Sequence, residues 1–118
     1  PTMESTNDRL FTRHGVDTTF VTFCDEDILN EKCIKELEEE IMFLVEQASR
    51  QKMVLDFCNV KHLTSAFLGF LVKVHTRIRE KKGYLKLRNV DPAIYKIFKI
   101  TGLNKILDIR RTSENSSV

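Results

Sequence analysis

The histidines and glycines of this 118-residue chain are the first residues to test for chemistry, because catalytic and nucleotide-binding sites use them often. The three histidines, His14, His62 and His75, have no serine or cysteine partner at the spacing of a nucleophile motif. The four glycines, at positions 15, 69, 83 and 102, cannot form either of the common phosphate-binding loops. We therefore predict no catalytic residue and no cofactor.

The three cysteines, Cys24, Cys33 and Cys58, are odd in number and far apart in the sequence. They form no C-x-x-C pair, and no histidine stands at ligand spacing beside them, which argues against structural zinc and a disulfide scaffold. This usage favours a reducing cytoplasm. No apolar run approaches the ~20 residues of a membrane-spanning helix, and the polar stretch Pro1–Asp8 is unlike a secretory signal. We expect a cytoplasmic protein without a membrane partner.

The charge distribution is asymmetric along the chain. Residues 1–50 carry five basic and twelve acidic side chains, a formal charge of −7, whereas residues 51–118 carry fourteen and five, a formal charge of +9. A basic half makes nucleic acid a candidate partner. The sequence lacks a helix-turn-helix arrangement and has few aromatic residues placed to stack on bases, so we expect protein partners instead.

Hydrophobic periodicity predicts one α/β domain. Strands over 10–14 and 18–24, with a turn near 14–17, form a predicted hairpin. Apolar residues at three- and four-residue steps predict an amphipathic helix over 30–50. The mostly apolar stretch 53–58 predicts a strand at the centre of the sheet.

The second half of the chain continues the alternation. We predict a helix over 64–82, with Thr64 or Ser65 as its cap and Gly83 as its left-handed stop. A strand over 84–88, a helix from Asp91–Pro92 to Gly102 and a strand over 105–109 follow. The order β-β-α-β-α-β-α-β implies a mixed, largely parallel sheet with helices packed on one side. The predicted domain spans 9–110, between a disordered segment over 1–8 and a frayed tail over 111–118.

The most specific feature is a stretch in the middle of the chain. The sequence VLDFCNVKHLTSAFLGFL, over Val54–Leu71, resembles the heart of the STAS domain, the fold of bacterial anti-sigma factor antagonists. In that family an apolar strand ending in Leu-Asp leads through a short loop to Asp-Ser-Ser-Gly-Leu-Gly and a helix. The resemblance continues through Gly83–Leu87, Asn89–Pro92, Thr101–Leu103 and Ile106–Leu107. It spans roughly Arg9 to Ile109 and implies a single STAS-like domain.

The resemblance also implies a function. In the family, the serine after the motif's aspartate is phosphorylated by a partner that is both anti-sigma factor and serine kinase, and Ser65 is the matching position. The unmodified protein binds this kinase and frees the sigma factor, and phosphorylation weakens that binding. A serine phosphatase is a further implied partner. We therefore expect a non-enzymatic phosphoprotein that regulates transcription through a sigma factor.

Ser65 and its neighbours leave alternatives open. A serine before an apolar helix is usually a cap, worth ~1 kcal/mol. The family's aspartate, second serine and glycine are replaced by Thr64, Ala66 and Phe67, which favours a STAS-type scaffold or constitutive binder without phosphoregulation. Phe67 also fits the apolar stripe of the helix. A small-ligand or nucleotide-sensing domain is a further alternative, with a pocket near the strand ends.

The expected partner surface lies at the start of the second long helix, and the oligomeric state stays open. We predict partner contacts from Lys61, His62, Leu63, Thr64, Ser65, Ala66, Phe67, Gly69 and Lys73.

Overall fold

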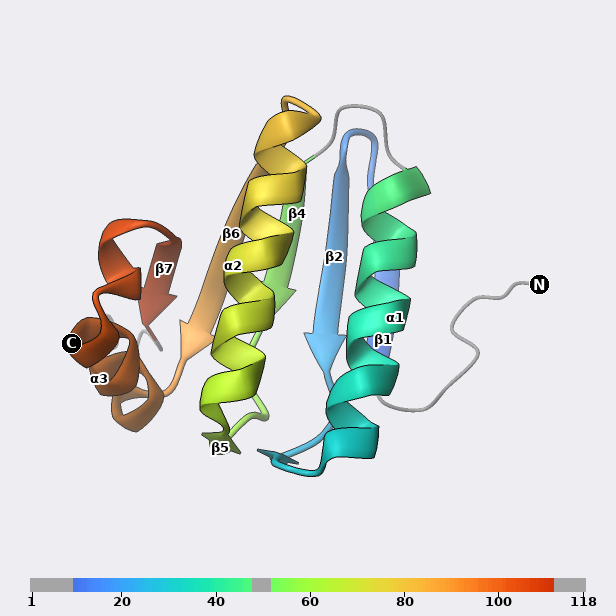
Figure 1. Cartoon of the computed structure of the whole chain (residues 1–118). Helices are drawn as coiled ribbons and strands as arrows, with labels where there is room; N and C mark the ends of the chain where they lie inside the picture. The colour runs from blue at the N-terminus through green and yellow to red at the C-terminus, as the bar shows by residue number, and fades with distance from the viewer. Residues whose placement is uncertain (1–9, 48–51, 112–118) are drawn as a thin grey trace, which may run out of the picture.

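A five-stranded β-sheet forms one layer of the computed structural model, which describes residues 10–47 and 52–111. The strands lie in the order β1-β2-β4-β6-β7 (Figure 1). Their bounds are Leu10–His14 for β1, Thr18–Phe23 for β2, Lys52–Asp56 for β4, Tyr84–Val90 for β6 and Asp108–Arg111 for β7. The sheet is mixed and carries helices, as the sequence predicted.

Strands β1 and β2 form the predicted antiparallel hairpin, and the other neighbouring strands pair in parallel. The hairpin turn closes where the Gly15 N–H donates to the Thr18 carbonyl oxygen at 2.6 Å. A Cβ atom at Gly15 would lie 3.2 Å from that oxygen, which is a tighter contact than side chains usually make. β4 lies at the centre of the sheet with Met53 and Leu55 buried, and the predicted central strand is confirmed.

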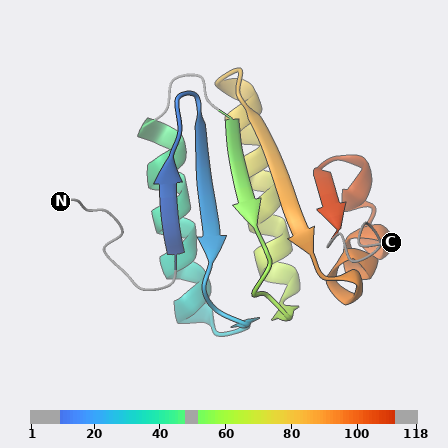
Figure 2. The ribbon, with the colours of Figure 1, turned by 180° about the vertical axis from the view of Figure 1, so that it is seen from behind.

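Helices α1 (Glu31–Gln47) and α2 (Ser65–Glu80) cover one face of the sheet (Figure 1). Their apolar stripes form the core: Leu37, Ile41, Leu71 and Val74 are fully buried, as are Val21, Leu55 and Leu87 of the sheet. Seen from behind, the opposite face of the sheet carries no described helix (Figure 2). The predicted extension of α1 over 48–50 lies outside the described residues.

The end of α2 differs from the prediction. Lys82, with φ of 64°, is the left-handed residue, and the helix ends at Glu80. The N–H of Lys82 donates to the Arg79 oxygen at 2.9 Å, and the N–H of Gly83 donates to the Ile78 oxygen at 2.8 Å. This pattern is a Schellman motif in which Gly83 stands one residue after the left-handed position. The predicted role of Gly83 is therefore wrong.

Helix α3 (Pro92–Thr101) begins and ends as predicted. The Asp91 carboxylate accepts from the Ala93 N–H at 2.9 Å, Pro92 is the first helical residue, and Gly102 closes the helix with φ of 80°. The helix lies at the β7 end of the sheet (Figure 1). Ile94 and Phe98 are buried, so α3 attaches to the domain by its apolar side.

The last strand lies later in the chain than predicted. A short 3-10 helix, η1 (Leu103–Lys105), follows Gly102, and β7 begins only at Asp108. The N–H groups of Ile106 and Leu107 donate to the Leu103 oxygen at 3.0 and 2.8 Å, so the backbone is still turning where a strand over 105–109 was predicted. β7 reaches Arg111, one residue past the predicted domain end, and the predicted disordered segment over 1–8 and the tail over 112–118 lie outside the described residues.

Across residues 10–47 and 52–111, no helix combines the length and the apolar character needed to cross a membrane.

Candidate functional site around Ser65

The loops after β2 and β4 meet at the carboxyl ends of these parallel strands. Two short strands, β3 (Asp27–Ile28) and β5 (His62–Leu63), pair in parallel between the loops. The N–H groups of Lys61 and His62 donate to the Glu26 carbonyl oxygen at 2.7 and 3.0 Å. Strands of only two residues are too short to show an alternating hydrophobic pattern, so the sequence did not predict them. Their pairing fixes the direction in which the chain enters α2.

Thr64 is the cap of α2, which decides between the two caps that the sequence allowed. Its backbone is extended, with φ of −101° and ψ of 165°, and its Oγ1 accepts from the Phe67 N–H at 3.4 Å. Ser65 is the first helical residue and is exposed. Its hydroxyl forms no hydrogen bond with any residue that the structure describes. Because Thr64 supplies the cap, the Ser65 hydroxyl remains accessible to a partner.

Phe67 lies in the core, and its prediction as a partner contact is wrong. The side chain is 0% exposed. Its ring packs edge-on against Phe23, with centroids 5.6 Å apart, and against Phe70 at 5.8 Å. Phe67 therefore belongs to the helix's apolar stripe, as periodicity indicated, and it holds the first turn of α2 against the sheet.

The other predicted contacts lie on one continuous stretch of chain. Leu63 and Thr64 are half-buried, whereas Lys61, His62, Ser65 and Ala66 are exposed. On α2, Ser65, Gly69 and Lys73 stand four residues apart, so they share one exposed helix face. A Cβ at Gly69 would meet nothing within 4 Å, so its small size leaves open surface beside the serine.

Two acidic residues lie close to the Lys61 and His62 side chains of this segment. His62 Nδ1 lies 2.7 Å from Asp27 Oδ1, and both side chains are exposed. Lys61 Nζ lies 3.6 Å from the carboxylate of Asp91, the residue that caps α3. The sequence did not single out Asp27, because only the β3–β5 pairing brings it to His62.

Asp56 anchors the carboxyl end of β4 just before this segment, and it is 8% exposed. Its carboxylate accepts from the Cys58 N–H at 2.9 Å, from Asn89 Nδ2 at 3.1 Å and from Arg88 Nε at 3.2 Å. Burial alone would raise its pKa, but the hydrogen bonds from Asn89, Cys58 and Arg88 outweigh burial, and the pKa of Asp56 lies below its ordinary value. The network supports the strand end structurally.

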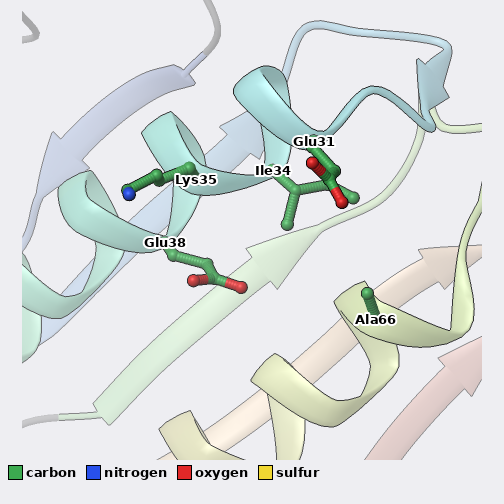
Figure 3. A pocket seen from close by; sticks show the side chains of 5 residues that line it. All are labelled: Glu31, Ile34, Lys35, Glu38 and Ala66. Carbon is green, nitrogen blue, oxygen red and sulfur yellow. The ribbon is translucent and has the colours of Figure 1, made fainter.

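A groove of about 360 Å³ lies between the first turns of α1 and α2. It is lined by Glu31, Ile34, Lys35 and Glu38 of α1 and by Ala66 of α2 (Figure 3). The sequence offered a pocket near the strand ends as an alternative, but it did not indicate the α1 residues that line this groove. The predicted parallel strands indicated that the two helices start side by side, because helices that follow neighbouring parallel strands begin at the same end of the sheet.

The sequence of residues 11–116 matches the family model described as the STAS domain. The anti-sigma-B factor antagonist of Bacillus subtilis is 33% identical over 78 residues, which cover 66% of this chain and 70% of that protein.

Solved structures share the fold. The structure of an anti-sigma-factor antagonist (STAS) domain protein from Planctomyces limnophilus matches with a TM-score of 0.76 and 19% identity, covering 91% of this chain and 93% of that chain. The Bacillus cell fate determinant SpoIIAA in its phosphorylated form matches with a TM-score of 0.65 and 14% identity, covering 92% of this chain and 96% of that chain.

Proposed function

The chain belongs to the STAS domain family, and we propose that it acts as an anti-sigma factor antagonist whose binding is switched by phosphorylation of Ser65. The partner is an anti-sigma factor with serine kinase activity. The observation that carries the proposal is the position of Ser65, exposed at the first residue of α2, with the cap already supplied by Thr64. A kinase can reach this hydroxyl without displacing a structural hydrogen bond.

The local electrostatics suit a reversible phosphate. The first turn of α2 contains no acidic residue, and the positive end of the helix dipole stabilises an anion there. A phosphoserine adds about −1.5 to −2 charges at neutral pH. The modification therefore leaves the helix intact and changes the charge of the docking surface, so that a complementary partner binds less tightly.

The docking surface consists of the exposed residues around the serine. Lys61 and His62 flank it on one side, and Gly69 and Lys73 continue it along α2. This surface supports regulation by protein binding, in keeping with a family whose members are typically non-catalytic. A serine phosphatase that removes the phosphate would restore binding.

A constitutive antagonist without phosphoregulation is the second candidate. It is favoured by Thr64 and Phe67, which stand where the family motif has an aspartate and a glycine. In that case the same surface binds the anti-sigma factor and Ser65 remains unmodified. A sensor of anionic nucleotides is less well supported, because Glu31 and Glu38 line the groove beside α2 and would repel phosphate.

Binding measurements with purified proteins test the proposal. The kinase-type anti-sigma factor from the same organism is titrated with wild type, Ser65→Ala and Ser65→Glu by calorimetry. We expect wild type and Ser65→Ala to bind alike and Ser65→Glu to bind at least tenfold more weakly. Thr76→Glu, which adds the same single negative charge at an exposed position farther along α2, is the control. Equal affinities for all four proteins would support the constitutive antagonist instead.

A further inference from the structure

No described helix covers the face of the sheet opposite α1 and α2 (Figure 2). The strand register places cationic and aromatic side chains on this face. Alternation assigns the residues of this face, because Val21, Leu55 and Leu87 point to the helices and their strand neighbours point away. Five basic side chains lie on the uncovered face: Arg13, Lys52, Lys86, Arg88 and Arg110. The acidic ones on the same five strands are Asp56, which is buried, and Asp108.

Three aromatic residues of this face lie on one diagonal of the sheet. In the strand register, Phe11 of β1 pairs with Thr22 of β2, and Phe20 precedes Thr22 by two residues on β2. Tyr84 lies on β6, two strands beyond β2, and its register position is two residues before that of Phe20. With strands about 4.8 Å apart and about 3.3 Å per residue, the diagonal is about 20 Å long. Phe11 is 63% exposed and Tyr84 is 43% exposed, so both rings offer stacking surface.

Cations stand on both sides of this aromatic diagonal. By register, Arg13 and Lys52 lie on one side of it, and Lys86 and Arg88 lie on the other. The guanidinium carbons of Arg13 and Arg88 lie 4.9 and 5.5 Å from the ring centroid of Phe20. Among the described residues, Lys52 and Lys86 form no ion pair, so their charges remain available.

We propose that this uncovered face binds single-stranded nucleic acid, with bases stacking on the aromatic diagonal and phosphates meeting the flanking cations. Flat sheets use this combination for single strands, because every base has a stacking face and the backbone is uniformly negative. The exposed rings favour this occupant over an acidic peptide, which would use the cations alone. The sequence argued against nucleic acid because few aromatic residues stood where they could stack on bases. The strand register brings three aromatic residues together on one face of the sheet.

Fluorescence anisotropy with a labelled oligothymidylate of about 12 nucleotides tests the proposal on the full chain. With Arg13, Lys52 and Lys86 engaged and Arg88 paired with Asp56, the slope of log K against log salt should be about −2, an affinity loss of about 20-fold between ~50 and ~200 mM salt. We expect Arg13→Glu/Lys86→Glu to weaken binding more than tenfold. Arg79→Glu/Lys96→Glu, an equal charge change on exposed positions of α2 and α3, should weaken it less than threefold.

Phe11→Ala tests stacking without changing charge, and we expect a loss of about tenfold with an unchanged circular dichroism spectrum. Amide chemical shift changes on adding the oligonucleotide should map to β1, β2, β4 and β6. Shift changes confined to the helices, or equal losses for the two double variants, would overturn the proposal. Binding of a labelled oligoglutamate of the same length, with no binding of the oligothymidylate, would assign the face to an acidic protein segment and also overturn it.

Discussion

The Oγ1 atom of Thr64 accepts a hydrogen bond from the backbone N–H of Phe67, and this contact frees the neighbouring Ser65 from the task of capping α2. Phe67 is also the residue that seats the helix in the core, with its ring against Phe23. One short segment therefore combines a cap, an exposed hydroxyl and a core anchor in successive positions. Substitutions at Thr64, Ser65 and Phe67 separate these three roles.

Thr64→Ala should destabilise the protein by about 1 kcal/mol, because it removes the cap of α2. Ser65→Ala should change the free energy of unfolding by less than half as much, since its hydroxyl is not used as a cap. Thr64→Ser, which keeps the acceptor oxygen, is the matched control. Urea unfolding of the three variants checks the assignment, and a larger cost for Ser65→Ala than for Thr64→Ala would contradict it.

Phe67→Ala should destabilise the protein by about 3–5 kcal/mol, because it opens a cavity among packed rings. Phe43→Ala, which removes a ring that is 59% exposed on α1, should cost far less. Chemical denaturation of both variants measures the difference. If the two substitutions cost the same, Phe67 does not anchor α2 as described.

Two left-handed positions should respond to substitution with opposite signs. Lys82→Gly should stabilise the protein by about 0.5–1 kcal/mol, because φ of 64° strains a side-chain-bearing residue. Gly102→Ala should destabilise it by about 1 kcal/mol, since the φ there is 80° and nothing else crowds a Cβ. Thermal unfolding of both variants gives the signs, and a destabilised Lys82→Gly would show that Lys82 contributes more than its backbone conformation.

Asp56 should make the stability fall at acid pH. Its pKa in the folded state lies below the ordinary 3.8, so between these values the unfolded chain binds more protons and acid favours unfolding. Its contribution is present above about pH 4 and is lost as the pH falls through the folded-state pKa. The stability difference between wild type and Asp56→Asn, followed by urea unfolding from neutral pH downward, should therefore shrink. A difference that stays constant down to low pH would contradict the role of the carboxylate.

Much of the fold follows from local pattern. The buried strand β4, the hairpin turn at Gly15 and the start of α3 at Asp91–Pro92 each depend on neighbouring residues, and the sequence predicted all three. The strands β3 and β5 escaped prediction because their pairing joins residues far apart in the chain. The left-handed residue after α2, Lys82, was not predicted because the neighbouring Gly83 is the residue type that usually takes this conformation.

For the candidate site too, part was predictable from the sequence and part was not. The motif and the helix start located Ser65, whereas choosing Thr64 over Ser65 as the cap required the backbone geometry. Asp27 and the groove residue Glu38 reach the site only through the parallel crossover. The aromatic diagonal from Phe11 to Tyr84 depends on strand register, which no local pattern in the sequence specifies.

Mass spectrometry of Ser65 tests the central claim most directly. The protein is incubated with ATP and the kinase-type anti-sigma factor of its own organism, and intact masses and peptides of wild type and Ser65→Ala are compared. We expect one added phosphate that maps to Ser65 and is absent from the variant. An unmodified wild-type protein, under conditions in which the kinase modifies a control substrate, would contradict it.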